Sequence, residues 1–399
     1  MFERECFNGD AMLPSLIVIS PAPASIINGK TFLDKKFVEG MQAYAARWDG
    51  SVKCLLRFGR DVFPYGDFFE LGELNFEIMD LQNETDLQSR LDTKTDIFLA
   101  SADDEAVFDF NFLRSGATNV CYVIEYTPEI RYSILRMENK KCVIRKIYSF
   151  LWIARKERLR RIAFRHALAI QANGYPAYEF YKELNKNTIM YLDSRIKEHL
   201  LASEYEMNAR DLRLKNKEKL NIVYSGRLER MKGAQDIIKI SRIILDSGVD
   251  FELNIFGSGS LSQKIEDDIS KFDLKGRVAL RGAVDFETEL VPFVRSKADL
   301  YLSCHRQADP SCTYLESMGC GVAIAGYSNR MWSELCRQSG GGWAVPLGDV
   351  SALARSIVEM SGDRPALAAF CKAAREFAGR HLFEQEFEKR VAQLEKLVD

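Results

Sequence analysis

The sequence predicts an α/β protein with two doubly wound domains, each built on a mostly parallel β-sheet. Short apolar runs that suit buried strands alternate with longer segments that suit helices, and this alternation starts twice, at Leu16 and at Leu220. With 399 residues, the chain is also longer than one hydrophobic core requires. We therefore expect domains at residues 1–205 and 206–382, followed by a terminal helix at 383–399.

Composition and charge exclude several classes of function. The net charge of −2 gives no electrostatic reason to expect a nucleic-acid partner. The nine cysteines include no C-x-x-C pair and the four histidines are scattered, so we expect neither a metal site nor a disulfide scaffold. Residues 1–13 lack the apolar core of a signal peptide, and no apolar run is long enough to cross a bilayer. We expect a cytoplasmic protein whose membrane contact, if any, is peripheral.

The N-terminal half predicts a parallel sheet, because the intervals between its apolar runs leave room for crossover helices such as Thr31–Trp48. Glu125 follows the fifth run, at the sheet edge where ligands of open α/β sheets gather, so its carboxylate is a candidate base or acceptor anchor. A solvated residue at a strand end is the alternative. The expected strands are 16–20, 52–58, 76–79, 97–100, 120–124 and 167–172, the last followed by a turn at 173–176.

Residues 131–165 differ from the rest of the chain in charge. They hold twelve Lys and Arg side chains against two acidic ones, Glu138 and Glu157, with aromatic residues interleaved. A basic, aromatic helical segment suits the surface of an anionic membrane. The same composition suits RNA, and a solvated helix pair is a third interpretation. A lipid-linked substrate would favour the membrane.

The second half repeats the strand and helix pattern after a polar segment, 201–219, which lacks an apolar face and predicts an interdomain linker. The loop after the first strand carries Arg227 and Lys232 between two glycines. Two cations at a strand end can receive a pyrophosphate whose charge grows as it leaves, although a pair of surface cations is the simpler alternative. The expected strands are 220–224, 251–256, 278–280, 300–302, 322–325 and 342–345.

Residues 303–324 have the features of half a nucleotide-diphosphate site. They follow an apolar run that predicts a strand, and Pro310 suits the first turn of a helix. Backbone N–H groups of residues 311–313 would be unpaired at that helix N-terminus, where the macrodipole favours a phosphate. Glu316 lies further along the same helix, where its carboxylate can accept hydrogen bonds from a ribose. An ordinary strand-to-helix connection is the alternative.

A second glycine loop, Phe256–Ser260, looks superficially like a dinucleotide-binding fingerprint. Ser262 stands where the third glycine should be, and the loop falls in the middle of its domain rather than at the first strand–helix turn. An NAD-dependent oxidoreductase is therefore disfavoured.

Together these residues resemble the C-terminal half of retaining GT-B glycosyltransferases of the glycosyltransferase family 4 type. The N-terminal half resembles that family only in its strand–helix rhythm and in the loop at Gly29. The resemblance implies two Rossmann-like domains facing across a cleft, with the donor nucleotide on the second, the acceptor on the first, and a terminal helix that crosses back. It runs from about residue 221 to 349 through Gly226-Arg227-Leu228, Lys232-Gly233, Phe256-Gly257-Ser258-Gly259, Arg281-Gly282, Ala298-Asp299-Leu300, Glu316, Gly319 and Gly321-Val322-Ala323-Ile324.

The resemblance also assigns roles. Arg227 and Lys232 match the diphosphate-binding pair, and Glu316 matches the carboxylate that holds the ribose. Further donor contacts are implied for Gly29 in a loop that closes over the phosphates, for Gly226 and Gly257, for Val284 at the base-binding edge, and for Ser311, Cys312 and Thr313, whose amides would contact phosphate and sugar.

Two departures from the family pattern concern catalysis. The family usually carries a second glutamate ahead of the one matched by Glu316; here Ala308 stands in its place, and Asp309, displaced by one, is the candidate for sugar binding. Many members have a histidine after the last N-terminal strand, where this chain has Glu125. The contact of that histidine with the donor sugar is therefore an open question.

We expect a cytoplasmic retaining glycosyltransferase that makes a surface polysaccharide or glycolipid, with residues 131–165 as the candidate contact with the inner face of the membrane. It would transfer a sugar from a UDP- or GDP-sugar to a saccharide or lipid-linked saccharide. Arg227, Lys232 and the helix N-terminus would stabilise the departing diphosphate without a metal or other cofactor, and Glu125 and Asp309 are the other catalytic candidates. The alternatives are an inactive GT-B scaffold and a nucleotide-sugar epimerase of the same shape.

Overall fold

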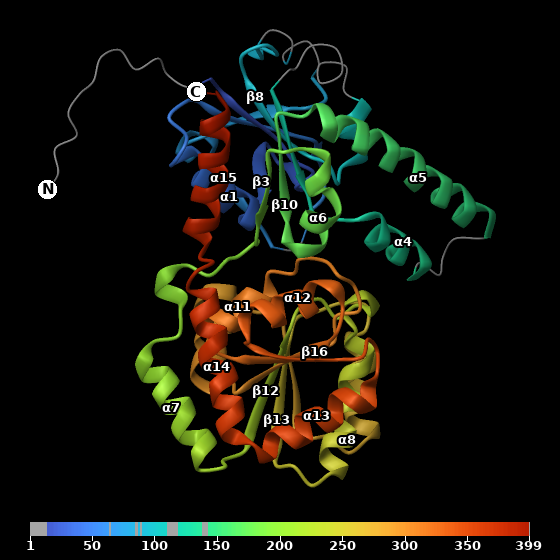
Figure 1. Cartoon of the computed structure of the whole chain (residues 1–399), viewed down its shortest axis with the longest axis vertical. Coiled ribbons are helices and arrows are strands. Elements are labelled where there is room, and N and C mark those ends of the chain that lie inside the picture. The colour runs from blue at the N-terminus through green and yellow to red at the C-terminus, as the bar shows by residue number, and fades with distance from the viewer. Residues whose placement is uncertain are drawn as a thin grey trace, which may run out of the picture.

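The computed structural model of the chain describes residues 14–63, 65–83, 87, 90–109, 119–137 and 143–398. They form two sheet-and-helix units stacked along the long axis of the molecule (Figure 1). The predictions for residues 1–13, and for Glu138, Lys140 and Lys141 of the basic segment, lie outside the described residues. Among the helices described, none combines the length and the apolarity needed to span a bilayer.

The N-terminal unit is built on a seven-stranded parallel sheet with the order β11-β10-β9-β8-β1-β4-β7. Strand β1 is buried along its whole length and pairs with β4 on one side and β8 on the other, so the strand order reverses there. Ligands of such sheets bind at this switch point, outside the carboxyl ends of the strands. The strands are β1 (Leu16–Ile19), β4 (Val52–Leu56), β7 (Glu77–Asp80), β8 (Ile97–Ser101), β9 (Val120–Ile124), β10 (Ala169–Asn173) and β11 (Thr188–Tyr191).

The C-terminal unit is built on a six-stranded parallel sheet with the order β14-β13-β12-β15-β16-β17. Its switch point lies between β12 and β15, which pair over Ile222 and Val223. The sequence predicted all six strands because each contains a short, largely apolar run, as is typical of strands in a parallel sheet. They are β12 (Leu220–Ser225), β13 (Phe251–Phe256), β14 (Val278–Gly282), β15 (Leu300–Ser303), β16 (Ala323–Tyr327) and β17 (Gly342–Val345).

Helices cover both sheets, and the bounds of one of them correct a turn that the sequence predicted. The turn predicted at 173–176 is instead the start of α6, which follows β10 directly. The principal helices are α1 (Lys35–Ala45), α4 (Pro128–Met137), α5 (Val143–His166), α6 (Gly174–Tyr181), α7 (Glu204–Lys215), α8 (Ile237–Asp246), α9 (Ser262–Lys271), α10 (Val291–Lys297), α11 (Thr313–Gly319), α12 (Arg330–Ser339), α13 (Val350–Gly362), α14 (Arg364–Ala378) and α15 (Phe383–Val398).

The helix predicted over Thr31–Trp48 begins later than expected. Its first residues belong to β3, because the Phe32 ring packs edge-on against two other phenylalanines and so favours an extended backbone. The Asp34 side chain then accepts a hydrogen bond from the backbone N–H of Phe37 and starts α1. A small separate sheet with the order β5-β2-β3-β6 results from β2 (Ala24–Ile27), β3 (Lys30–Asp34), β5 (Phe58–Gly59) and β6 (Gly66–Phe69).

The linker predicted at 201–219 is wrong, because most of this segment is α7. Its first turn is fixed by a capping box between Ser203 and Glu206. The helix is held by a polar side chain rather than by an apolar stripe: the buried guanidinium of Arg210 donates hydrogen bonds to backbone carbonyls of α10 and of the turn after α11. The boundary predicted at 205/206 thus falls inside α7, and its exact position remains a prediction.

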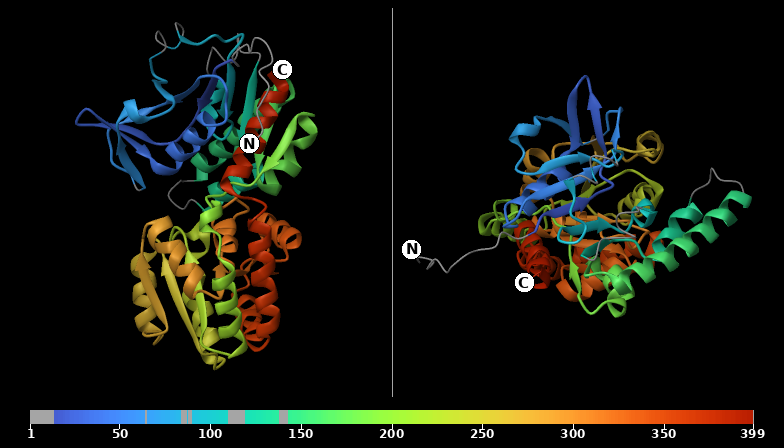
Figure 2. Two further views of the ribbon diagram at one scale, coloured as in Figure 1. Left: turned by 90° about the vertical axis from the view of Figure 1, so that its left-hand side faces the viewer. Right: turned by 90° about the horizontal axis from the view of Figure 1, so that it is seen from above.

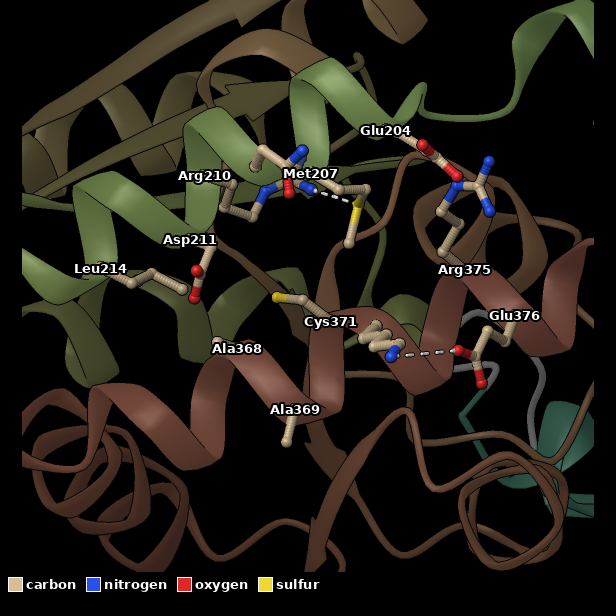
Figure 3. Close-up of a pocket in the computed structure, with 12 residues that line it drawn as sticks. Glu204, Met207, Arg210, Asp211, Leu214, Ala368, Ala369, Cys371, Arg375 and Glu376 are labelled. Atoms are coloured by element: carbon tan, nitrogen blue, oxygen red, sulfur yellow. Dashed lines mark hydrogen bonds and ion pairs between the residues drawn. The ribbon is translucent and has the colours of Figure 1, made fainter.

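A pocket of about 520 Å³ lies between α7 and α14, which run side by side (Figure 3). Met207 and Arg210 line it from α7, and Ala368 and Cys371 line it from α14. Its walls belong to the C-terminal unit alone, so this pocket is separate from the space between the two units.

The terminal helix α15 crosses back to the N-terminal unit, as the resemblance implied. Phe383, Phe387 and Val391 join the N-terminal core, and the rings of Phe387 and Tyr44 pack edge to face with centroids 5.0 Å apart. The preceding α14 packs into the C-terminal core instead. In Figure 1 the red α15 therefore stands beside α1, which ties the two units together.

Candidate active site

The space between the two units holds a pocket of about 350 Å³. It lies at the carboxyl ends of β12 and β13 and is closed from the other side by the start of α1 and by Tyr65 and Gly66. The structure brings together six of the predicted donor-binding residues along its wall: Gly226, Gly257, Val284, Cys312, Thr313 and Glu316.

Glycine is required where β12 and β13 end at this pocket. Gly257 has φ +125°, and a Cβ atom there would lie 2.0 Å from the carbonyl oxygen of Gly226. The backbone N–H of Gly226 in turn donates a 3.0 Å hydrogen bond to the carbonyl of Phe256. The two strand ends therefore touch through backbone alone, which leaves their outer side open to a ligand.

Glu316 is the best-placed carboxylate in the pocket. It is 8% exposed on α11. Burial raises its pKa, and the positive charges of Arg195 and Lys36 partly offset this effect. The guanidinium of Arg195, which also lines the pocket, stacks 4.1 Å from the ring centroid of Phe286. The pocket thus combines an acceptor carboxylate, two cations and an aromatic ring.

Lys232 does not line this pocket, which departs from the role predicted for it. Its Nζ atom lies 2.5 Å from Oδ2 of Asp309, and both side chains are largely buried. Gly233 makes this pairing possible, because a Cβ atom at that position would lie 1.8 Å from the carbonyl oxygen of Cys304. In this conformation Asp309, predicted to bind the sugar, neutralises the lysine predicted to bind the diphosphate.

Arg227 lies on the surface of the cleft, outside the pocket wall. Burial raises the pKa of Tyr126, which lies on the opposite unit, to about 12. The negative charge of Asp309 adds to this rise, and the positive charge of Arg227 opposes it. Both charges therefore act across the cleft. Arg227 is exposed and close enough to the N-terminal unit for its charge to act there.

The loop before α11 leads into a helix N-terminus, as predicted, but this helix is short. The Oγ atoms of Ser311 and Thr313 lie 2.5 Å apart, and α11 begins at Thr313 with Cys312 at its N-cap. Cys312 and Thr313 reach the pocket, whereas Ser311 is turned toward Thr313. The helix has 7 residues, so its dipole adds little to the charged side chains nearby.

A second pocket, of about 490 Å³, lies at the switch point of the N-terminal sheet. It is lined by residues that follow β1, β8 and β9, among them Glu125, and adjoins the donor pocket through Asp34 and Lys36. The Asn173 amide donates a 2.9 Å hydrogen bond to Glu125 Oε1. Burial, together with the negative charges of Asp103 and Asp193, raises the pKa of Glu125 to about 7.

Sequence reasoning missed the charged pair at the junction of the two pockets. Lys36 forms an ion pair with Asp193. Burial, the largest single effect, lowers the pKa of Lys36, but the charge and the hydrogen bond of Asp193, together with the charges of Cys312 and Glu125, raise it well above its usual value. Asp193 follows β11 almost directly, so the strand-end rule that selected Glu125 could have found it. Lys36 carried no such signal, because it lies in the first turn of a helix.

Gly29 is not where the resemblance placed it. It forms the turn between β2 and β3, and a Cβ atom added there would meet nothing within 4 Å. The N-terminal residues that line the donor pocket are Asp34–Lys36, Tyr65 and Gly66 instead. The expected closure of a glycine loop over the phosphates is therefore not made in this conformation.

Within the described residues, no three His, Cys, Asp or Glu side chains are grouped as ligands for a metal ion. The histidine of the donor loop, His305, is fully buried, and burial together with the charge of Lys232 lowers its pKa to about 3. Independence from a metal remains a prediction.

Comparison with known proteins agrees with this geometry. Residues 207–377 match the family "Glycosyl transferases group 1". The amylovoran biosynthesis glycosyltransferase AmsK of Erwinia amylovora is 27% identical over 179 residues, which are 43% of this chain and 42% of AmsK. The match thus spans less than half the length of that relative.

Solved structures resemble nearly the whole chain. Sucrose-phosphate synthase from Thermosynechococcus elongatus is 15% identical with a TM-score of 0.68, over 96% of this chain and 98% of its own. HepE from Anabaena, in complex with UDP-glucose, is 14% identical with a TM-score of 0.66, over 96% and 99%. These identities are low enough that the likeness speaks for the fold, and the predicted GT-B fold is confirmed. The chain thus has a GT-B fold, and its residues 207–377 are similar to the glycosyl transferases group 1 family.

Proposed function

We propose that the protein is a retaining glycosyltransferase that moves a sugar from a UDP- or GDP-sugar to a saccharide or lipid-linked saccharide. One observation carries the proposal. The pocket between the units places Glu316 beside the backbone of Gly226 and Gly257 and beside Val284, in the arrangement that the family motifs imply for a nucleotide sugar. The carboxylate would accept the ribose hydroxyls, and the bare strand ends would admit the phosphates.

The cations around the pocket suit the chemistry of the departing diphosphate. As the bond from the sugar C1 to the phosphate oxygen breaks, negative charge grows on that oxygen. Arg227 faces it from the C-terminal unit, Arg195 from the pocket wall, and Lys36 from the N-terminal unit. Fixed cations in a partly dry cleft stabilise this charge more strongly than water does, so the chain's own side chains suffice for the step.

The N-terminal pocket suits the acceptor. It adjoins the donor pocket at Lys36, so an acceptor hydroxyl can approach C1 from the side that the diphosphate leaves. Attack on that face retains the anomeric configuration. The hydroxyl proton passes to the departing phosphate oxygen or to Glu125, whose pKa of about 7 suits a proton acceptor near neutrality.

Relatives favour a role in the synthesis of a surface polysaccharide or glycolipid. AmsK acts in amylovoran biosynthesis, and WaaG, another structure of the same fold with a TM-score of 0.61, is involved in lipopolysaccharide biosynthesis. HepE binds UDP and UDP-glucose. We further propose that the protein works in the cytoplasm at the inner face of the membrane, where a lipid-linked acceptor would be available.

One observation favours the second candidate, an inactive scaffold that binds nucleotide sugars. Lys232 is neutralised by Asp309, and Ala308 occupies the place of the usual first glutamate. A scaffold would bind donor without turning it over. An epimerase of the same shape, the third candidate, would alter the sugar without releasing nucleotide diphosphate in proportion to acceptor.

A transfer assay separates these candidates. The protein is incubated with UDP-glucose or GDP-mannose and a mixture of membrane glycolipids, and released nucleotide diphosphate is measured with and without a chelator. The glycosyltransferase proposal predicts acceptor-dependent release that survives chelation and is lost in Glu316→Gln, and a product whose anomeric configuration, read by NMR, matches the donor. Donor binding without release supports the scaffold, and product with inverted configuration contradicts retention.

A further inference from the structure

The first half of α5 projects from the N-terminal unit into solvent (Figure 2). Between Val143 and Arg155 none of its side chains is buried. Seven of them are large, apolar and exposed, and Ile144 is 79% exposed. A soluble protein rarely leaves such a cluster uncovered unless it is an interaction site.

Six of these seven side chains lie on one side of the helix, and the seventh, Phe150, stacks on Tyr132 of α4. Val143, Ile147 and Leu151 recur every fourth residue, and so do their neighbours Ile144, Tyr148 and Trp152. Residues four apart lie one above the other on a helix, so the two rows form one continuous surface. We call this surface the α5 apolar face, formed by Val143, Ile144, Ile147, Tyr148, Leu151 and Trp152.

The charge around the α5 apolar face is almost entirely positive. The single acidic residue of α5, Glu157, points inward: its Oε2 atom accepts hydrogen bonds from Arg160, at 2.7 Å, and from Tyr181, at 3.0 Å. Arg155 and Arg158 continue toward the body of the protein and are exposed. The basic residues of α5 are Arg145, Lys146, Arg155, Lys156, Arg158, Arg160, Arg161 and Arg165.

The second half of α5 anchors the helix in the N-terminal unit. Phe164 and Arg160 are buried, and Arg160 Nε donates a 3.0 Å hydrogen bond to the Ala102 carbonyl. Helix α4 packs along α5, with the rings of Tyr132 and Phe150 stacked 4.4 Å apart. Helix α4, which starts just after Glu125 and packs beside residues 230–232, therefore links the edge of the cleft to the helix that carries the face.

We propose that the α5 apolar face docks the protein on an anionic lipid bilayer. An apolar helix face rimmed by Lys and Arg is the arrangement that inserts at the boundary between lipid headgroups and acyl chains. Aliphatic side chains such as Ile144 and Leu151 gain nothing from bases, which stack on aromatic rings, so single-stranded RNA fits the face less well. A second copy of the chain would bring two positive patches together, which like-charge repulsion opposes.

This inference deepens the proposed function and rests on it: docking would bring the enzyme to the bilayer that holds a lipid-linked acceptor. Vesicle binding itself does not depend on sugar transfer. A protein that binds vesicles and transfers no sugar would overturn the proposed function alone, and one that transfers sugar to a soluble acceptor without binding vesicles would overturn the docking proposal alone.

The test is co-sedimentation of the full chain with vesicles of phosphatidylglycerol and phosphatidylcholine. The variant Ile147→Glu/Leu151→Glu removes apolar area from the face and repels the anionic surface. Leu212→Glu on α7 is the matched control, because Leu212 is 59% exposed and Leu151 is 62% exposed. We expect the wild type and the control to sediment with anionic vesicles. The Ile147→Glu/Leu151→Glu variant should bind these vesicles at least about tenfold more weakly.

A charge variant tests the second half of the proposal. Arg155→Ser/Arg158→Ser keeps the α5 apolar face and should lose the preference for phosphatidylglycerol over pure phosphatidylcholine. Wild-type binding should also weaken as salt is raised, because screening shortens the reach of these charges to about 10 Å at 0.1 M. Equal binding by Ile147→Glu/Leu151→Glu and wild type, binding to RNA in place of vesicles, or a dimer that this variant dissociates would each overturn the proposal.

Discussion

The Nζ atom of Lys232 lies 2.5 Å from Oδ2 of Asp309, and this ion pair joins the two loops that meet at the switch point of the C-terminal sheet. The sequence suggested separate tasks for the two residues, one toward the diphosphate and one toward the sugar. Their pairing means that neither charge is independent: a bound donor must either share Lys232 with Asp309 or draw it away.

Removing Lys232 alone should destabilise the protein. Lys232→Ala leaves the buried Asp309 carboxylate without its partner, which costs about 3–5 kcal/mol of the free energy of unfolding. Urea denaturation near neutral pH measures this change. The double variant Lys232→Ala/Asp309→Ala should lose less than the sum of the two single variants, and additive losses would show that the pair is not coupled.

Glu125 should make stability depend on pH. Its pKa rises from 4.5 to about 7 on folding, so the folded state holds this proton more tightly than the unfolded state. The free energy of unfolding should therefore fall as pH rises from about 4.5 to about 7 and then level off, by about 1–3 kcal/mol. Glu125→Gln should remove this fall and be the more stable protein above pH 7. Thermal unfolding across this range measures it, and parallel curves for the two proteins would refute the pKa assignment.

The same substitution tests the catalytic role of Glu125. If Glu125 accepts the acceptor proton, the wild-type kcat should rise through pH 7 with the fraction of ionised carboxylate, and Glu125→Gln should lower kcat while leaving the Kd for the donor unchanged. An unchanged kcat with a higher KM for the acceptor would instead make Glu125 an acceptor anchor.

Gly257→Ala should damage both stability and the donor pocket. The added methyl would lie 2.0 Å from the Gly226 carbonyl oxygen, and φ +125° is unfavourable for alanine, so we expect a loss of at least about 2 kcal/mol and weaker donor binding. Gly362→Ala is the control, since its methyl would meet nothing within 4 Å. Similar unfolding midpoints for the two variants would mean that the strand ends are not in contact.

Arg210→Ala should unfold far more easily than a surface substitution on the same helix. It strips hydrogen bonds from several buried carbonyls at once, for which we expect a loss of about 3 kcal/mol or more. Lys215→Ala, which removes a side chain that is 68% exposed, is the control. Equal melting temperatures of the two variants would mean that the Arg210 hydrogen bonds do not hold α7 on the C-terminal unit.

Much of the second unit could be predicted from the sequence, because its information is local. The run from Leu220 is apolar apart from Asn221 and predicts a buried strand. Gly257 and Glu316 follow strands whose carboxyl ends meet at one edge of a parallel sheet. Once the sheet is formed, the positions of these strands are enough to bring the two residues together.

The errors and omissions concern partners that are distant in sequence. The charges of Lys232 and Asp309, 77 residues apart, pair only once two loops have folded together, and Lys36 meets Asp193 only after 157 residues of chain. Helix α7 was missed for a related reason: it is anchored by Arg210, and hydrophobic periodicity does not detect a helix that is buried through a guanidinium.

The most direct test of the central claim, that the pocket between the units binds a nucleotide sugar through Glu316, is thermal unfolding with UDP-, GDP- and ADP-sugars. A ligand that binds only the folded state raises the melting temperature by mass action, so at least one donor should stabilise the wild type. Glu316→Gln should fold normally and lose about 1.5–3 kcal/mol of donor binding, because a charged acceptor is removed. A wild type that no donor stabilises, or a Glu316→Gln variant stabilised as much as the wild type, would contradict the assignment of this pocket.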